Sequence, residues 1–110
     1  MIADGLVAFV KRACPTCTLI ESEMRVAARK LSQFSVVSQD DPKFPSGVAR
    51  VIDDRALEHS WRAQIESTPT LIRYSGGVET ERVVGWDREG WRRLSGISDL
   101  GGALPSFRPG

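Results

Sequence analysis

The chain has 110 residues, of which 41% are hydrophobic and 26% are charged, a mixture typical of one soluble globular domain. Fifteen Lys and Arg residues against fourteen Asp and Glu leave a formal net charge of +1, which gives no basis for a nucleic-acid partner. No apolar run approaches the roughly 18 residues that span a bilayer, so no membrane partner is expected. Residues 1–10 lack a basic stretch before their apolar run, and we interpret them as a first core strand of a cytoplasmic protein.

The first half of the chain combines strand and helix signals. A run rich in strand formers at 6–10 predicts a buried strand. Apolar residues recur at three- and four-residue steps within 15–31, and this periodicity predicts a helix with a proline in its first turn. A second strand is predicted at 34–38. Residues 42–47 hold two prolines and a glycine and are interpreted as a loop, and 48–52 favours a short extended piece.

A second helix is predicted to begin at Asp53 or Asp54, either of which can act as its N-cap, and to end near Gln64. Apolar residues at four-residue spacing share one face of this helix: Leu57, Trp61 and Ile65.

A hairpin and a last helix follow. The apolar run 71–74 and the alternating run 78–84 flank Gly76-Gly77, which is a hairpin turn signal. Gly85 ends the second strand, and Asp87 is placed to cap a final helix.

This order of elements predicts an α/β fold. A helix between the first two strands requires a crossover, so these strands pair in parallel, whereas the hairpin makes the final pair antiparallel. We therefore predict a four-stranded mixed sheet with helices on both faces. The predicted domain spans residues 1–97. Residues 98–110 contain glycine and proline without periodicity, and we interpret them as a C-terminal tail or linker.

The two cysteines of the chain stand three positions apart, where the first strand meets the first helix. A disulfide that closes so short a loop contributes little entropy to stability, so the pair is better explained by chemistry than by stapling. The nucleophile in disulfide exchange is the thiolate, and a cysteine at a helix N-terminus faces unpaired N–H groups that favour this anion. Lys11 and Arg12 add positive charge nearby.

Three motifs, in this order, resemble the thioredoxin superfamily over roughly residues 5–96: Cys14-Pro15-Thr16-Cys17 after a strand, Thr68-Pro69-Thr70 opening a strand, and the Gly76-Gly77 hairpin followed by Gly85. The resemblance implies a thioredoxin-like fold and a cis peptide bond before Pro69, beside the cysteines. It also implies that the backbone of Thr68 pairs with a bound substrate segment.

The sequence departs from the main branches of that superfamily. The short segment before Cys14 is closer to the glutaredoxin core than to thioredoxins proper. Ala13 stands where thioredoxins have a tryptophan, and Ala8 stands where they bury an aspartate that transfers protons. Gly85-Trp86-Asp87 replaces the Gly-Gly-x-Asp segment with which glutaredoxins bind glutathione. The stretch from Phe44 to Asp53 is similar to insertions in membrane-anchored and peroxiredoxin-like branches.

We interpret Cys14 as the exposed nucleophile and Cys17, one turn inward, as the resolving thiol. Thr68 and Pro69 are predicted to bind substrate, and Pro15 and Thr16 to tune the reduction potential. The expected protein is a monomeric thiol–disulfide oxidoreductase, a reductase in a cytoplasmic setting, that needs no bound cofactor. Its partners would be a protein or small-molecule disulfide and an electron donor, either a thioredoxin reductase-like protein or glutathione.

Other interpretations stay open. The cysteines can be half of a zinc site, although only His59 adds a ligand of the usual kind, or an inert pair. Pro69 can be an ordinary trans proline. His59 is interpreted as a solvated helix residue and the three tryptophans as core or flank, with Trp86 alternatively near a ligand groove. The competing function is a thioredoxin-like binding or electron-transfer module of a larger assembly.

Overall fold

The computed structural model describes residues 4–110, so the first three residues of the predicted domain lie outside the described part. The elements follow in this order: β1 (Gly5–Val10), α1 (Pro15–Leu19), α2 (Glu21–Lys30), β2 (Phe34–Ser38), β3 (Val51–Asp53), α3 (Glu58–Arg62), β4 (Thr70–Ser75), β5 (Val78–Val84), β6 (Trp86–Asp87), α4 (Arg88–Ser95) and β7 (Phe107–Arg108). The α/β class and the mixed sheet are confirmed.

The central sheet has five strands in the order β3-β2-β1-β4-β5, rather than the four predicted. As predicted, β1 and β2 are parallel, and β4 and β5 form an antiparallel hairpin at Gly76-Gly77. The additional strand is β3, which lies parallel to β2. Its pairing is extended by the amide of Asp54, which donates to the Ser38 carbonyl at 2.8 Å. The short extended piece predicted at 48–52 thus becomes an edge strand because β2 offers unpaired backbone groups there.

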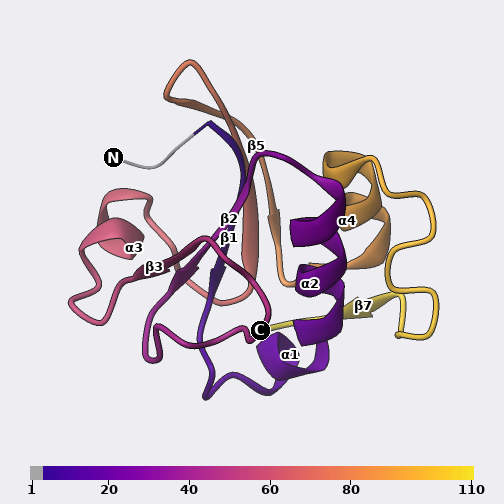
Figure 1. Cartoon of the computed structure of the whole chain (residues 1–110), viewed down its shortest axis with the longest axis horizontal. Helices are drawn as coiled ribbons and strands as arrows, with labels where there is room; N and C mark the ends of the chain where they lie inside the picture. The colour runs from indigo at the N-terminus through magenta and orange to yellow at the C-terminus, as the bar shows by residue number, and fades with distance from the viewer. Residues whose placement is uncertain (1–3) are drawn as a thin grey trace.

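Helices cover both faces of this sheet, with α1, α2 and α4 on one face and α3 on the other (Figure 1). Because side chains alternate across a strand, β1 supplies both cores. Leu6, Ala8 and Val10 face the larger core, whereas Val7 and Phe9 face the smaller one. The larger core also holds Cys17 and the last helix, and the smaller core is completed by residues around α3.

The first predicted helix is divided at Ile20, whose φ of −97° and ψ of 13° separate α1 from α2. The amide of Ile20 still donates to the Thr16 carbonyl at 3.2 Å, so the chain continues on nearly the same path. The division leaves α1 as a short separate turn that carries the cysteine motif. The predicted core stripe survives it, because Ile20, Met24 and Ala27 are all buried.

The second predicted helix is much shorter than expected. It occupies only Glu58–Arg62, because the residues after Asp54 form a turn in which Leu57 has a left-handed φ of 60°. Leu57 and Trp61 are 49% and 81% exposed, so the apolar face predicted for this helix does not belong to the core.

Residues 98–110, for which the sequence indicates no regular structure, fold back onto the domain. Leu100 is buried in the larger core, and β7 pairs with β6 in a second, two-stranded sheet. The Trp86 indole donates to the Pro105 carbonyl at 2.8 Å and helps to fix this segment. The C-terminus therefore lies beside α1, near the start of the chain's first helix (Figure 1).

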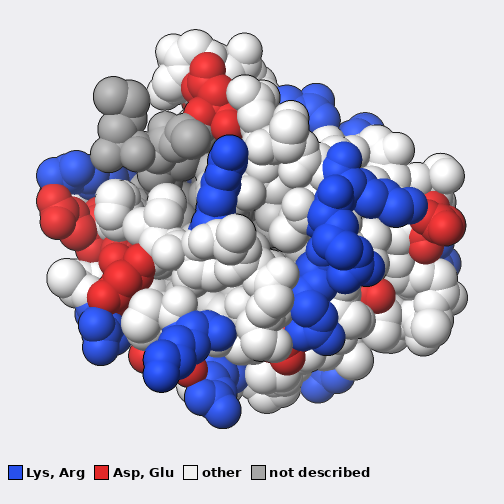
Figure 2. Space-filling model, viewed as in Figure 1, with Lys and Arg blue, Asp and Glu red and all other residues white. Residues whose placement is uncertain are grey.

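Charged side chains of both signs are spread over the face shown in Figure 2, where Lys and Arg gather along α2. Arg29 and Lys30 stand in the last turn of that helix, where positive charge is favourable. Nearer its start, Glu21 and Arg25 lie 3.7 Å apart, a surface pair of a kind that contributes about 0–1 kcal/mol. Such surface pairs contribute little to holding α2 on the sheet, whereas its buried residues Met24 and Ala27 pack in the larger core.

Candidate active site

The cysteine motif begins where β1 leaves the sheet. The amides of Arg12 and Ala13 donate to the carboxylate of Asp40 at 2.7 and 2.9 Å, which holds the turn after β1 against the end of β2. Cys14 follows in an extended conformation and forms the N-cap of α1, while Pro15 takes the first helical turn. This local structure brings Cys14 to the edge of a groove and turns Cys17 inward. The expectation that Cys14 is exposed is wrong, because its residue is only 6% exposed.

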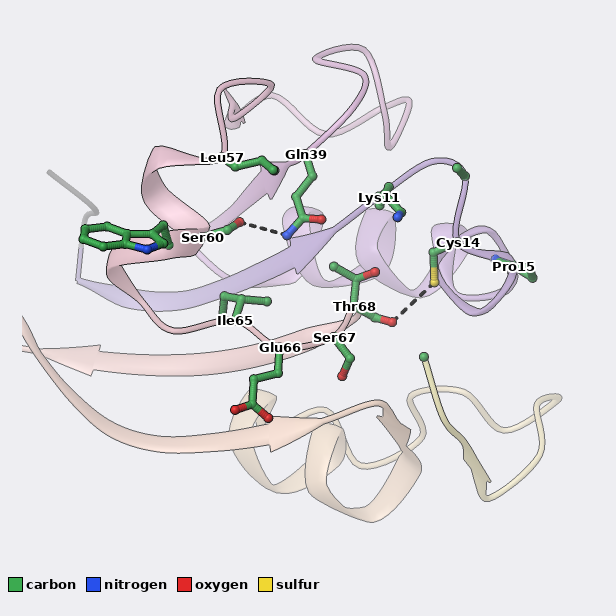
Figure 3. Close-up of a pocket in the computed structure, with 13 residues that line it drawn as sticks. Lys11, Cys14, Pro15, Gln39, Leu57, Ser60, Ile65, Glu66, Ser67 and Thr68 are labelled. Carbon is green, nitrogen blue, oxygen red and sulfur yellow. Dashed lines mark hydrogen bonds between the residues drawn. The ribbon is translucent and has the colours of Figure 1, made fainter.

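Hydrogen bonds hold the Cys14 sulfur on two sides. The Cys17 amide donates to Cys14 Sγ at 3.2 Å, and the Cys14 thiol donates to the backbone carbonyl of Thr68 at 3.4 Å. Figure 3 shows the sulfur pointing at that carbonyl across the gap between α1 and the loop before β4. Both cysteines are free thiols.

The two thiols have opposite pKa shifts. Burial raises the pKa of the Cys14 thiol, but hydrogen bonds with the thiol and amide of Cys17 lower it. Hydrogen bonds with the Thr68 side chain and the Thr16 backbone lower it further, and the resulting pKa lies below the ordinary value of 9.0. Burial raises the pKa of Cys17 to about 12, and the hydrogen bond and charge of Cys14 raise it as well. At neutral pH the more reactive thiolate is therefore that of Cys14.

The loop before β4 faces the Cys14 sulfur from the side opposite α1. The Thr68–Pro69 peptide bond is cis, and Thr68 and Pro69 are buried beside Cys14. The Pro69 carbonyl accepts from the Gly85 amide at 2.7 Å, and the Thr70 hydroxyl donates to the Ser67 carbonyl at 2.8 Å. These bonds fix the loop to the hairpin, so the Thr68 carbonyl stays directed at the cysteine.

Pro15 and Thr16, the two residues between the cysteines, have different surroundings. Pro15 is exposed, whereas Thr16 is buried and its hydroxyl donates to the Pro109 carbonyl at 2.7 Å. The sequence did not predict this contact between α1 and the C-terminal segment, because 93 positions separate the partners. No local pattern signals such a contact.

A groove of about 570 Å³ opens beside Cys14. One wall carries Cys14, Pro15 and Thr68, and the opposite wall carries apolar side chains from around α3. These side chains are Leu57, Trp61 and Ile65. The sequence predicted that these three residues share one face of a helix. In the structure they line the groove instead. Gln39 and Ser60, which also line it, donate and accept a hydrogen bond of 2.9 Å across its floor (Figure 3).

Two other predicted candidates lie away from the groove. Trp86 is fully buried in the larger core, with its ring centroid 5.4 Å from that of Trp91, so the alternative that places it near the groove is wrong. His59 is half-buried on α3 and is not among the residues that line the groove. Ala8, in place of an aspartate, is fully buried in the core that contains Cys17. Its methyl group cannot transfer a proton.

Within residues 4–110, no group of three or more His, Cys, Asp and Glu side chains is placed to hold a metal ion. In the same range, no helix combines the length and the apolar character needed to cross a membrane.

The fold is that of thioredoxins of known structure. The germline-specific thioredoxin Deadhead of Drosophila melanogaster superposes with a TM-score of 0.62 at 20% identity, over 86% of this chain and 82% of its own. Mitochondrial thioredoxin 3 of Saccharomyces cerevisiae gives 0.59 at 14% identity, over 86% and 76%. The thioredoxin of Malassezia sympodialis gives 0.59 at 16% identity, over 86% and 77%.

Sequence comparison adds no closer relative: no protein-family model and no curated protein matches the chain significantly. The structural similarity and the Cys14–Cys17 pair together define a thioredoxin-fold protein with a Cys-x-x-Cys motif at the strand–helix junction. At these levels of identity, the similarity establishes the fold.

Proposed function

We propose that this protein is a thiol–disulfide oxidoreductase in which Cys14 attacks and Cys17 resolves. The observation that carries the proposal is the opposite pKa shift of two neighbouring thiols, one beside a groove and one fully buried. A structural pair would need no such difference. In contrast, disulfide exchange needs one thiolate ready to attack and one thiol held back until the first has reacted.

The chemistry balances as a two-electron exchange. The Cys14 thiolate attacks one sulfur of a substrate disulfide, a mixed disulfide forms, and the other substrate sulfur leaves as a thiolate that takes up a proton. Cys17 then loses its proton and attacks Cys14 Sγ. The protein disulfide forms, and the second substrate thiol is released. The substrate is reduced, and the cysteine pair is oxidised.

The first step prepares the second one. The hydrogen bond and charge of Cys14 help to raise the pKa of Cys17 in the reduced protein. Both contributions disappear once Cys14 Sγ is bonded to a substrate sulfur, because that sulfur is then neither a thiol nor an anion. The pKa of Cys17 is therefore lower in the mixed disulfide than in the reduced protein, although burial, the largest cause of its rise, persists.

The surrounding residues take supporting roles. The Thr68 carbonyl lies 3.4 Å from Cys14 Sγ, which favours Thr68 and Pro69 as the backbone platform for an extended substrate segment. Pro15 and Thr16 tune the potential, since the Thr16 backbone helps to lower the pKa of Cys14. The proposal requires no bound cofactor and no metal ion.

We place the protein among cytoplasmic reductases that act as monomers. Its substrate would be a protein or small-molecule disulfide, and a thioredoxin reductase-like protein or glutathione would return the electrons. The absence of the Gly-Gly-x-Asp segment favours the first of these donors.

The decisive measurement is the reduction potential of the Cys14–Cys17 pair, obtained by equilibration in defined glutathione buffers and trapping of free thiols. We expect a reversible two-electron couple below about −230 mV, in the range of reductases. A value near about −120 to −180 mV would make the protein an oxidase or isomerase.

Two variants complete this test. Cys14→Ser is expected to abolish exchange, whereas Cys17→Ser is expected to accumulate the mixed disulfide with a model substrate, visible by mass spectrometry. If the native protein shows no reversible couple, the oxidoreductase proposal fails and a binding module takes its place.

A further inference from the structure

Residues 109–110 lie beside the candidate active site. The Pro109 carbonyl accepts the hydrogen bond from the Thr16 hydroxyl, 2.7 Å away. Gly110 lies so close to the loop before β4 that a Cβ built on it would stand 1.8 Å from the Thr68 carbonyl oxygen. Gly110 also lines the groove beside Cys14. The end of the chain thus contacts both walls that flank the cysteine.

Pro109 and Gly110 occupy the space beside Cys14 that a disulfide substrate has to enter. An extended substrate segment has to reach Cys14 Sγ and the Thr68 carbonyl, which lie 3.4 Å apart. With the chain end in place, Cys14 is only 6% exposed. A bulky partner therefore meets the backbone of Gly110 where its own backbone would have to lie.

We propose that residues 107–110 form a strap that competes with protein substrates for the groove and has to move aside before Cys14 can react with them. The functional meaning of the strap rests on the proposed function, because that function identifies the groove as the substrate site. Whether these residues restrict the access of a reagent to Cys14 does not depend on redox activity.

The strap is anchored at its base and loosely held at its end. At the base, the Arg88 amide donates to the Ser106 carbonyl at 2.9 Å, and β7 pairs with β6. The strap residues are all exposed, and its first two, Phe107 and Arg108, are the ones held in β7. Beyond them, the Thr16–Pro109 hydrogen bond ties residues 109–110 to α1. A single net hydrogen bond contributes about 0.5–1.5 kcal/mol, so Pro109 and Gly110 can leave the groove while the β6–β7 pairing stays in place.

The test is a full-length variant, Gly110→Ala, whose methyl group cannot coexist with the Thr68 carbonyl in the observed position. The matched control is Gly102→Ala, because a Cβ there has only ordinary contacts, the nearest at 3.5 Å from the Asp99 carbonyl. Cys14 alkylation is measured with a bulky maleimide–polyethylene glycol reagent and with iodoacetamide. A chain that ends at Ser106 removes the strap completely and serves as the second variant.

We expect the bulky reagent to modify Cys14 on the order of fivefold to tenfold faster in Gly110→Ala than in the native protein. The chain that ends at Ser106 should be at least as fast, and Gly102→Ala should match the native protein. Iodoacetamide is small enough to pass the strap, so its rate should change less. Equal or slower reaction of both strap variants with the bulky reagent would overturn the proposal.

These outcomes separate the strap from the proposed function. Alkylation needs a reactive thiolate but no redox cycle, so faster alkylation without a reversible couple keeps the strap and rejects the oxidoreductase. A reversible couple with unchanged alkylation keeps the oxidoreductase and rejects the strap.

Discussion

The two cysteines share a motif but not an environment. Cys14 caps α1 beside a groove and receives a hydrogen bond from the Cys17 amide, whereas Cys17 is 0% exposed within the larger core. Hydrogen bonding stabilises an anion and burial destabilises it, so the balance differs at positions one helical turn apart. The opposite pKa shifts of the two thiols thus arise from their surroundings.

Reaction of Cys14 with iodoacetamide should depend on pH in the direction set by its lowered pKa. The rate should rise with pH as the thiolate forms, reach half its maximum below pH 9.0, and fall at lower pH as the thiol is protonated. Cys17 should stay unmodified over the same range, because its pKa is raised to about 12. Mass spectrometry of the alkylated peptides measures both rates.

Cys17→Ala is the control for this profile. It removes the thiol that lowers the pKa of Cys14, so the midpoint for Cys14 should move to higher pH. Modification of Cys17 before Cys14 in the native protein would contradict the assignment of roles.

At the scale of elements, α3 shows how a single buried carboxylate shapes the groove. Asp54 is 1% exposed and accepts hydrogen bonds from the amides of His59 and Ser60 at 2.9 and 3.0 Å. The Ser60 hydroxyl donates to it as well, at 2.6 Å. Because of these hydrogen bonds, α3 begins only at Glu58, after a turn in which Leu57 is exposed. Leu57 and Trp61 then line the groove on the side opposite Cys14.

Asp54→Ala is therefore expected to lower the free energy of unfolding by about 1–3 kcal/mol, because it leaves buried N–H groups without a partner. Urea unfolding measures the change. Asp53→Ala is the matched control, since the Asp53 carboxylate is exposed and pairs with Arg55 at the surface. A loss as large in the control as in Asp54→Ala would show that the cap is not the cause.

At the scale of the whole molecule, the C-terminal segment completes the core. Leu100 packs in the same cluster as Trp86 and Trp91, and the Leu100 carbonyl accepts from Arg92 Nε at 2.8 Å. The Trp86 indole finds its partner in the Pro105 carbonyl. The packed core therefore includes residues beyond the boundary predicted at residue 97.

A chain that ends at Ile97 should accordingly lose at least about 3 kcal/mol of unfolding free energy, the scale of a large core deletion. A chain that ends at Ser106 retains Leu100 and Pro105 and should unfold at nearly the same urea concentration as the native protein. Equal stability of all three chains would support the boundary at residue 97 and a detached tail.

Much of this protein follows from its sequence alone. A run of strand formers predicted the strand at 6–10, alternation predicted the one at 78–84, and three- and four-residue spacing predicted the helix after Cys14. The strand at 34–38 was predicted as well. The cap of the last helix was also local, with Asp87 accepting from the Gly90 amide at 3.4 Å. The cysteine motif was a local signal too, because Cys14, Pro15 and Cys17 lie within four consecutive positions at the start of a helix.

Only the tertiary structure decided how distant segments meet. The fifth strand, the exposed apolar face of α3, the burial of Trp86 and the passage of Pro109 over Thr16 all depend on contacts between residues far apart in sequence. Such contacts produce no periodic pattern in the sequence. Each one depends on the backbone position of a distant partner, which local propensity does not specify. The sequence thus determined which residues can react, and the packing of the whole chain decided what surrounds and covers them.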